Sequence, residues 1–129
     1  MTIHGKSRYP GLFIWLKDGT KIPVVVPDGC LLLQAGKQLE ILTGGFIKAG
    51  FHEVIYSEKA KAAMEQAKAE GRILWRISST MFSQIRGDVI LEPQGELDTE
   101  EAKKKYPPIV TKDQVLQELR AIGYASEKK

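Results

Sequence analysis

The sequence has few of the residues on which many protein functions depend. Its single cysteine, Cys30, cannot form a disulfide within the chain, so we expect a reducing, cytoplasmic compartment. Cys30 lies in an apolar run and is predicted to be a buried small hydrophobe rather than a nucleophile. The sequence contains no apolar run long enough to cross a membrane and no apolar stretch typical of a signal peptide after Met1, so we expect no membrane partner.

The excess of positive over negative charge is also small. The chain has 19 Lys and Arg against 16 Asp and Glu, a net charge of +3. Much of the excess lies late in the sequence, at Lys103, Lys104, Lys105, Lys128 and Lys129. This pattern is more typical of a solvated tail than of a phosphate-binding groove, and we do not expect a nucleic-acid partner.

The length of 129 residues, with 43% hydrophobic residues, suits one domain with a real core. Short apolar runs separated by turn residues predict strands at 12–16, 22–26, 30–34, 46–56 and 73–82. The turns are Asp18-Gly19, which is typical of a hairpin, and Pro27-Asp28-Gly29. The segment 38–42 fits either a short helix or a strand. We therefore predict a mainly β fold with an antiparallel sheet and added helices.

Three segments have helical patterns. Residues 57–70 are rich in Ala, Glu and Lys, with Ser57 as the expected N-cap and Gly71 as the stop. Asp98 and Glu101 form a candidate capping box for a helix that ends at Tyr106-Pro107-Pro108. Thr111 and Gln114 form a second candidate box, for a helix ending near Gly123. Its apolar face, made of Leu116, Leu119 and Ile122, is expected to pack on another element.

Residues that could carry chemistry are few. The two histidines, His4 and His52, each lack a carboxylate at the second position after them. The sequence has no cysteine pair, no HExxH motif, no serine nucleophile elbow and no correctly spaced phosphate loop. His52 lies in the middle of an apolar strand, where a lone histidine is more often structural than functional.

The segment Arg76-Ile77-Ser78 is a further candidate. Alternate strand residues point to the same face, so Arg76 and Ser78 are expected to share one space. A guanidinium beside a hydroxyl suits a carboxylate, because the fork binds two oxygens and the hydroxyl adds a third donor. On these residues alone, a plain surface ion-pair site is an equal alternative.

An ordered set of segments resembles the isopenicillin N synthase-like family of 2-oxoglutarate/Fe(II) oxygenases, from about Thr2 to Leu97. The segments are Tyr9-Pro10-Gly11-Leu12, Asp18-Gly19-Thr20-Lys21-Ile22-Pro23-Val24, Pro27-Asp28-Gly29-Cys30-Leu31-Leu32-Leu33-Gln34-Ala35-Gly36, Thr43-Gly44-Gly45-Phe46, Gly50-Phe51-His52-Glu53-Val54-Ile55 and Arg76-Ile77-Ser78.

The resemblance implies a fold, a reaction and site residues. The fold would be a partial double-stranded β-helix, which is jelly-roll-like, at 1–97, with a helical insertion at 57–70 and C-terminal helices at 98–129. His52 matches the later of the two iron-binding histidines, and Arg76 and Ser78 match the RxS motif that holds the far carboxylate of 2-oxoglutarate. The family couples 2-oxoglutarate decarboxylation to oxidation of a small organic substrate, with Fe(II) held by two histidines and one carboxylate.

The sequence departs from the family pattern at the metal site. The HxD pair, which supplies the other two iron ligands, would fall upstream of Met1, and His4 has no carboxylate partner. We therefore expect a C-terminal portion of an oxygenase that has little activity by itself, and we assign it no catalytic residue. The alternative is a non-catalytic binding module that retains the Arg76/Ser78 clamp. Strands missing from a half barrel would leave sheet edges unpaired, so self-association is a further expectation.

Overall fold

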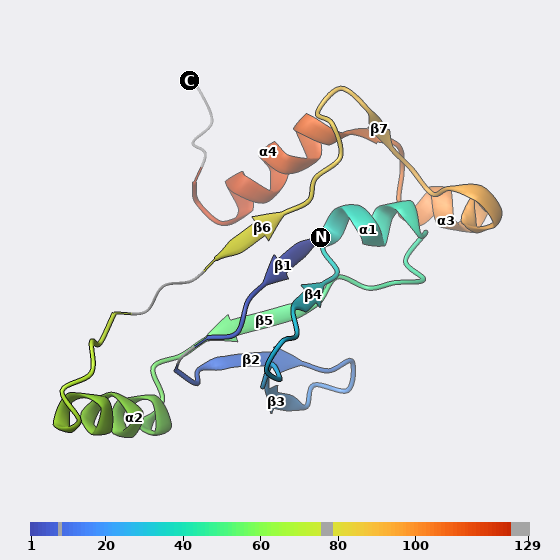
Figure 1. Ribbon diagram of the computed structural model, residues 1–129. Coiled ribbons are helices and arrows are strands. Elements are labelled where there is room, and N and C mark those ends of the chain that lie inside the picture. The colour runs from blue at the N-terminus through green and yellow to red at the C-terminus, as the bar shows by residue number, and fades with distance from the viewer. Residues whose placement is uncertain (8, 76–78, 125–129) are drawn as a thin grey trace. The chain divides into compact units, whose positions relative to one another are not determined.

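The computed structural model describes residues 1–7, 9–75 and 79–124 and divides into two compact units. The first unit contains Met1, Ala35–Ala49 and Ser83–Lys129. The second contains Thr2–Gln34 and Gly50–Phe82. Figure 1 shows the helices and strands of both.

The second unit contains two three-stranded antiparallel sheets. In one, β1 (Thr2–His4) lies between β4 (Leu32–Gln34) and β6 (Thr80–Phe82). In the other, β2 (Leu12–Trp15) lies between β3 (Lys21–Pro23) and β5 (Phe51–Val54). The predicted combination of antiparallel sheets and added helices is confirmed, and the sheets formed by the described residues are open rather than closed into a barrel.

Two glycines shape the β2 sheet. Gly19 has a φ of +84° in the predicted hairpin turn, where the amide of Thr20 donates to Oδ1 of Asp18 at 2.9 Å. This backbone contact lowers the pKa of Asp18. At Gly11 a Cβ atom would lie 2.5 Å from the carbonyl oxygen of Ile55, so the chain can approach this closely only without a side chain.

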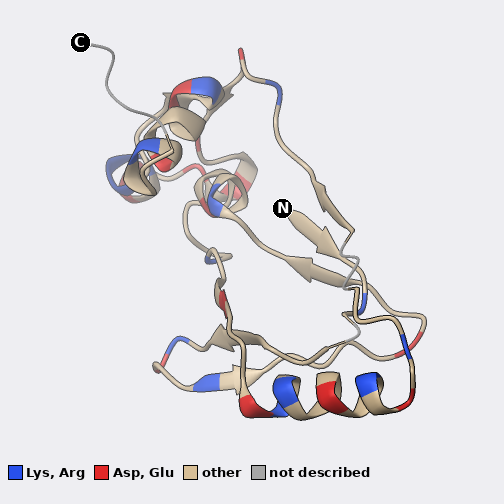
Figure 2. Cartoon of the chain, turned by 90° about the vertical axis from the view of Figure 1, so that its left-hand side faces the viewer, with Lys and Arg blue, Asp and Glu red and all other residues tan. Residues whose placement is uncertain are grey.

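Helix α2 (Glu58–Ala69) follows the prediction closely. The Ser57 hydroxyl accepts from the amide of Ala60 at 3.2 Å, and Gly71 follows the helix with a φ of +66°. Lysines and glutamates cover much of the helix surface, as Figure 2 shows, while Ala60 and Ala67 are buried. The helix therefore packs through small side chains and keeps its charges in water.

The first unit is built from short elements around a small core. Its elements are α1 (Lys37–Leu42), β7 (Ile90–Leu91), the 3₁₀ helix η1 (Gly95–Leu97), α3 (Glu100–Lys105), β8 (Ile109–Val110) and α4 (Thr111–Ala121). Strands β7 and β8 pair antiparallel. Ile41, Leu91 and Tyr106 form the buried core, with Leu42 and Ile109 packed against it.

A buried carboxylate organises this core. Oε1 of Glu40 accepts from the Tyr106 hydroxyl at 2.8 Å, and Oε2 accepts from the amide of Ala49 at 3.0 Å. The Lys48 ammonium donates to the Tyr106 hydroxyl at 2.8 Å. Gly45 has a φ of +82°, and a Cβ there would lie 2.5 Å from the Tyr106 hydroxyl, so the predicted break at Thr43-Gly44-Gly45 also makes room for this network.

Several predictions about burial and strand length are wrong. Cys30 is exposed, because its amide closes the turn by donating to the Pro27 carbonyl at 3.2 Å and strand β4 begins only at Leu32. The predicted strand at 46–56 is reduced to β5, since Phe46 continues the turn after α1 by donating to Thr43. The predicted strand at 73–82 is reduced to β6 among the described residues.

Both expected capping boxes are also wrong in detail. Thr99, not Asp98, caps α3, accepting from the amide of Ala102 at 3.1 Å, while Asp98 pairs with Lys103 at 2.9 Å. Thr111 begins α4, but its hydroxyl donates to the Val89 carbonyl at 2.8 Å instead of capping the helix. Asp98 and Thr111 therefore bind partners that the local sequence does not indicate.

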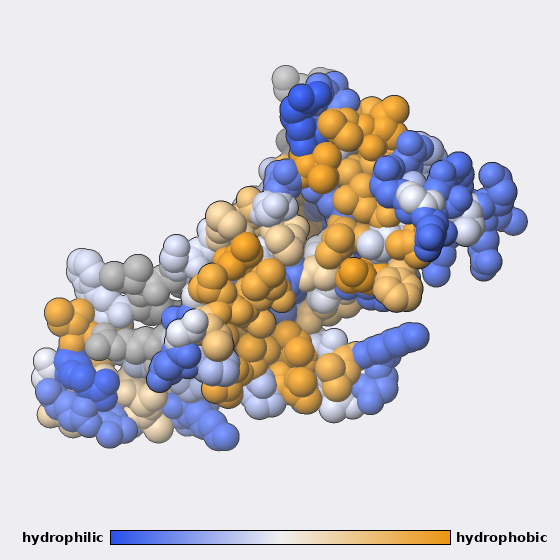
Figure 3. All heavy atoms as spheres, turned by 45° about the vertical axis from the view of Figure 1, so that its right-hand side comes forward, coloured by the Kyte–Doolittle hydropathy of each residue, from blue (hydrophilic) through white to orange (hydrophobic). Residues whose placement is uncertain are grey.

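Large apolar side chains remain at the surface, where Figure 3 shows them in orange. The face of α4 that was expected to pack is exposed, with Leu116 at 41%, Leu119 at 36% and Ile122 at 64%. The exposed edges of the two sheets carry apolar residues too, including Phe51 at 77% and Phe82 at 68%. None of the helices in the described part of the chain has the length and apolar character needed to span a bilayer.

Removal of the Tyr106 hydroxyl should destabilise the chain. Tyr106→Phe leaves Glu40 with one partner fewer, and we expect the free energy of unfolding to fall by about 1–2 kcal/mol in urea denaturation. Tyr124→Phe, at a residue that is 83% exposed, is the matched control and should change stability by less than about 0.5 kcal/mol. Equal effects of the two substitutions would contradict the assigned role of the network.

The Glu40 carboxylate should make stability depend on pH. Burial by itself raises the pKa of Glu40, but the Ala49 amide and the Tyr106 hydroxyl lower it, with help from two lysine charges, and the net pKa lies below its ordinary value. A lowered folded pKa contributes stability that is present above the unfolded pKa and is lost as pH falls through the folded pKa. Glu40→Gln should therefore lower the free energy of unfolding most near neutral pH. The difference in unfolding free energy between the variant and wild type should become smaller at acid pH.

Denaturation midpoints measured across that pH range test this expectation. Glu65→Gln, on the exposed surface of α2, is the control and should show no such pH-dependent difference. If the midpoints of Glu40→Gln and wild type differ by the same amount from neutral to acid pH, the charge of the carboxylate contributes nothing to stability.

Candidate functional site

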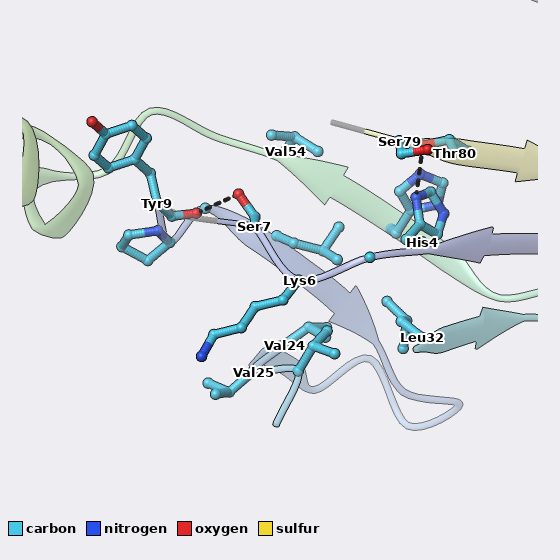
Figure 4. Close-up of a pocket in the computed structure, with 16 residues that line it drawn as sticks. His4, Lys6, Ser7, Tyr9, Val24, Val25, Leu32, Val54, Ser79 and Thr80 are labelled. Atoms are coloured by element: carbon cyan, nitrogen blue, oxygen red, sulfur yellow. Dashed lines mark hydrogen bonds between the residues drawn. The ribbon is translucent and has the colours of Figure 1, made fainter. Parts of the chain in front are cut away.

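A pocket of about 300 Å³ lies within the second unit and is lined by both of its sheets. Figure 4 shows it in close-up. One side comes from His4, Leu32 and Thr80 of the β1 sheet, and another from Leu12, His52 and Val54 of the β2 sheet. The volume is in the range of small-molecule sites.

His52 reaches the pocket from β5, where it lies opposite Ile14 in β2. Its Nδ1 lies 2.7 Å from Nε2 of Gln34, which is in β4 of the other sheet. The same Gln34 nitrogen donates to the carbonyl oxygen of Gly50 at 2.9 Å. Since a carbonyl only accepts, the bond to Gly50 fixes which end of the Gln34 amide faces His52.

This arrangement determines the state of the imidazole. The Gln34 amide nitrogen donates, so Nδ1 of His52 accepts. A neutral imidazole carries its proton on the other nitrogen, which makes Nε2–H of His52 a donor. A metal ligand needs a free nitrogen lone pair, so coordination through Nε2 would require the Gln34 amide to turn over.

His4 is a second imidazole of the pocket. It lies in β1 between Leu32 and Thr80, and its Nδ1 is 3.2 Å from the Thr80 hydroxyl, a contact marked in Figure 4. The ring centroids of His4 and His52 are 6.5 Å apart with an interplanar angle of 63°. The fold therefore brings together the two histidines that lie far apart in the sequence.

The described lining of the pocket is rich in polar groups. Among the described residues that line it, none is Asp or Glu, while Lys6, Ser7, Ser79 and Thr80 add polar groups to the imidazoles. Lys6 forms an ion pair with Asp28, which lies outside the lining, and this hydrogen bond and charge lower the pKa of Asp28. Val24, Val25 and Val26 with Leu32 and Val54 provide an apolar wall.

The described residues do not fit a complete iron centre. No group of three His, Cys, Asp or Glu side chains that could hold a metal ion occurs among residues 1–7, 9–75 and 79–124. The described residues of the pocket lining offer two imidazoles but no carboxylate, and the two-His-one-carboxylate set requires one. No chemical step through a metal ion can therefore be derived from these residues.

The sequence-predicted site is placed only in part. His52 lines the pocket, whereas Arg76 and Ser78 lie outside the described residues, so their shared orientation stays a prediction. Ser79, the next residue in the sequence, lines the pocket. Sequence reasoning missed the contributions of His4 and Gln34, because their relation to His52 depends on how two separate sheets face each other.

Comparisons with known proteins bear on the fold. No protein-family model and no curated protein matches the sequence. A solved structure that is similar belongs to a Caulobacter crescentus protein that is provisionally assigned to the 2OG-Fe(II) oxygenase family; it shares 24% identity with this chain, with a TM-score of 0.72. The match covers 94% of this chain and 37% of that protein, so this chain has the fold of little more than a third of it.

The hydrogen bond from Gln34 predicts the tautomer of His52. In the metal-free protein, ¹⁵N-detected imidazole spectra should show the proton of neutral His52 on Nε2, and Gln34→Met should reduce that preference because it removes the donor. Gln66→Met, on the exposed surface of α2, is the matched control and should leave both imidazole spectra unchanged. A wild-type His52 with its proton on Nδ1 would contradict the geometry.

Proposed function

We propose that this chain is the C-terminal portion of a 2-oxoglutarate/Fe(II)-dependent dioxygenase of the isopenicillin N synthase-like kind, which would oxidise a small organic substrate. The observation that carries the proposal is the shared fold: 94% of the chain matches a protein assigned to the 2OG-Fe(II) oxygenase family. The sequence resemblance from Thr2 to Leu97 points in the same direction. The two together favour a portion of a double-stranded β-helix at 1–97.

The proposal gives three residues a role. His52 is the later iron-binding histidine, and its place in a pocket between two sheets supports this assignment. Arg76 and Ser78 hold the far carboxylate of 2-oxoglutarate through the guanidinium fork and the hydroxyl. The described part of the β6 segment agrees with a clamp nearby, since Ser79 and Thr80 line the same pocket as His52.

The remaining ligands of Fe(II) would come from an HxD pair that the printed sequence does not contain. Metal affinity depends on the number and placement of ligands, so one or two imidazoles hold Fe(II) weakly. Within this proposal 57–70 is a helical insertion between the His52 strand and the RxS segment, and 98–129 forms the C-terminal helices. Cosubstrate binding, rather than turnover, is therefore the property that this chain itself should retain.

A second candidate is a non-catalytic binding module for small carboxylates. The observation that favours it is the pocket lining, which combines two imidazoles and hydroxyl groups with no Asp or Glu among its described residues. This candidate retains the same Arg76/Ser78 clamp and differs only in having no reaction. Complementation by a polypeptide that carries an HxD pair separates the two, since only an oxygenase portion would gain succinate formation.

Calorimetric titration of 2-oxoglutarate tests the clamp. We expect Arg76→Ala to weaken binding by roughly tenfold or more, because a bidentate charge-assisted contact to the carboxylate is lost. Arg72→Ala is the matched control: Arg72 is exposed and pairs with Glu70 at 2.6 Å, so its loss should leave binding unchanged. Equal affinity of wild type and Arg76→Ala would remove the clamp from the proposal.

A further inference from the structure

We infer that a second cavity, bounded on one side by helix α2, binds a small neutral organic molecule that carries one acceptor oxygen, such as a ketone or an ester. This site lies outside the proposed function, since its described lining contains neither a histidine nor a charged side chain. Three observations support it: the helix that bounds the cavity, the apolar lining and one buried tyrosine hydroxyl.

The second cavity measures about 320 Å³ and lies within the second unit. Ala60 and Met64 of α2 line one side, and Leu12 of β2 and Val54 of β5 line another. The cavity shares 9–12 and Val54 with the histidine pocket, which is the one lined by both imidazoles. Among the described residues, however, α2 lines only the second cavity and the imidazoles line only the first.

Hydrogen bonds hold the walls of the second cavity in place. The amide of Ile55 donates to the carbonyl of Gly11 at 2.9 Å, which joins the chain before β2 to the chain after β5. The Ser57 hydroxyl accepts from the amide of Ala60 at 3.2 Å and so fixes the first turn of α2. Walls that are held before a ligand arrives need little further ordering when it binds.

The lining favours a neutral ligand. Most of the described residues that line the cavity are apolar: Pro10, Leu12, Val54, Ile55, Met64 and Leu74. Burial of an unpaired charge among such side chains costs much more free energy than burial of a neutral group. The volume is sufficient for a molecule with a single ring.

The Tyr9 hydroxyl is the polar group that such a ligand would meet. Its oxygen is buried and has no hydrogen-bond partner in the described part of the chain, and Figure 4 shows the side chain extending away from His4 and Leu32. The Ser7 hydroxyl, in contrast, donates to the Tyr9 carbonyl at 2.9 Å, and Tyr56 is 70% exposed. Because a buried hydroxyl is costly without a partner, an acceptor oxygen on the ligand would stabilise the complex.

A water molecule suits the Tyr9 hydroxyl less well than an organic ligand does. A buried water typically makes about three hydrogen bonds, and a mostly apolar lining provides few partners for them. A ketone needs only one hydrogen bond at its oxygen, and its carbon atoms cover the apolar side chains.

Acetophenone and α-methylstyrene are matched probes for this site. They have nearly the same shape, but acetophenone has a carbonyl oxygen where α-methylstyrene has a CH₂ group. The sequence has three methionines, Met1, Met64 and Met81, so each methyl group can be followed in ¹H–¹³C spectra of the full chain. Only Met64 among them lines the cavity, and we expect both probes to shift its signal and to leave the other two unchanged.

Tyr9→Phe tests the hydrogen bond, since it removes the hydroxyl and keeps the ring. We expect the affinity for acetophenone to fall by roughly fivefold and the affinity for α-methylstyrene to stay the same. Comparing both probes in both proteins cancels the difference between their hydration free energies. Tyr56→Phe, which removes an exposed hydroxyl from the same lining, is the control and should change neither affinity.

Ala60→Leu tests the place of the site. Ala60 is 3% exposed, and the larger side chain should fill the cavity and weaken binding of both probes by roughly tenfold or more. Ala62→Leu, on the exposed surface of the same helix, is the control and should leave binding unchanged. Thermal unfolding of each variant shows whether it is folded, and Tyr9→Phe tests the same site without adding volume.

Three outcomes would overturn the inference. The first is acetophenone that does not shift the Met64 methyl signal. The second is a folded Tyr9→Phe variant that binds acetophenone as tightly as wild type, which would leave water as the partner of the hydroxyl. The third is acetophenone that shifts the imidazole signals of His4 and His52 but not that of Met64, which would place the probe in the histidine pocket.

Discussion

One side-chain amide connects the two sheets on which the pocket depends. Gln34 extends from β4 and donates both to the carbonyl of Gly50 and to the imidazole of His52, at 2.9 and 2.7 Å. The contact lets a strand of one sheet hold a side chain on a strand of the other. It also determines which nitrogen of His52 carries a proton, so a single interaction sets both the geometry and the chemistry of the site.

The consequence is a pocket in which His52 lies beside residues that the sequence does not link to it. The family resemblance assigns His52 to iron, yet in this chain its Nδ1 accepts a hydrogen bond and its neighbours in the pocket are His4, Lys6 and hydroxyl groups. These groups offer hydrogen-bond donors, and the Lys6 ammonium is already paired with Asp28. The described lining has no carboxylate that could bind iron, and coordination through Nε2 of His52 would require the Gln34 amide to turn over.

The other unit shows how a polar network can organise a small core. Glu40 is 8% exposed, yet its carboxylate is satisfied by an amide, a tyrosine hydroxyl and nearby lysines, so its pKa is lowered despite burial. Gly45 is needed beside it because no side chain fits against the Tyr106 hydroxyl. Buried polar groups of this kind stabilise a fold only when every partner is present.

Local signals in the sequence determined much of the secondary structure. The turn at Asp18-Gly19, the cap at Ser57 and the stop at Gly71 were all predicted, because each depends on the conformational preference of one or two residues and on neighbours within a few positions. The sequence also singled out His52, through its place in an apolar strand and the order of the segments around it.

Only the tertiary structure decided burial and the partners of polar groups. Cys30 and Leu116 have the apolar character of core residues but are exposed, since burial depends on which other element covers them. The sequence around His4 offers no carboxylate partner, and the fold gives this histidine Thr80 and His52 as neighbours. The physical reason is that a propensity acts between residues close in the chain, whereas a site is assembled from residues that strand pairing and sheet packing bring together over tens of positions.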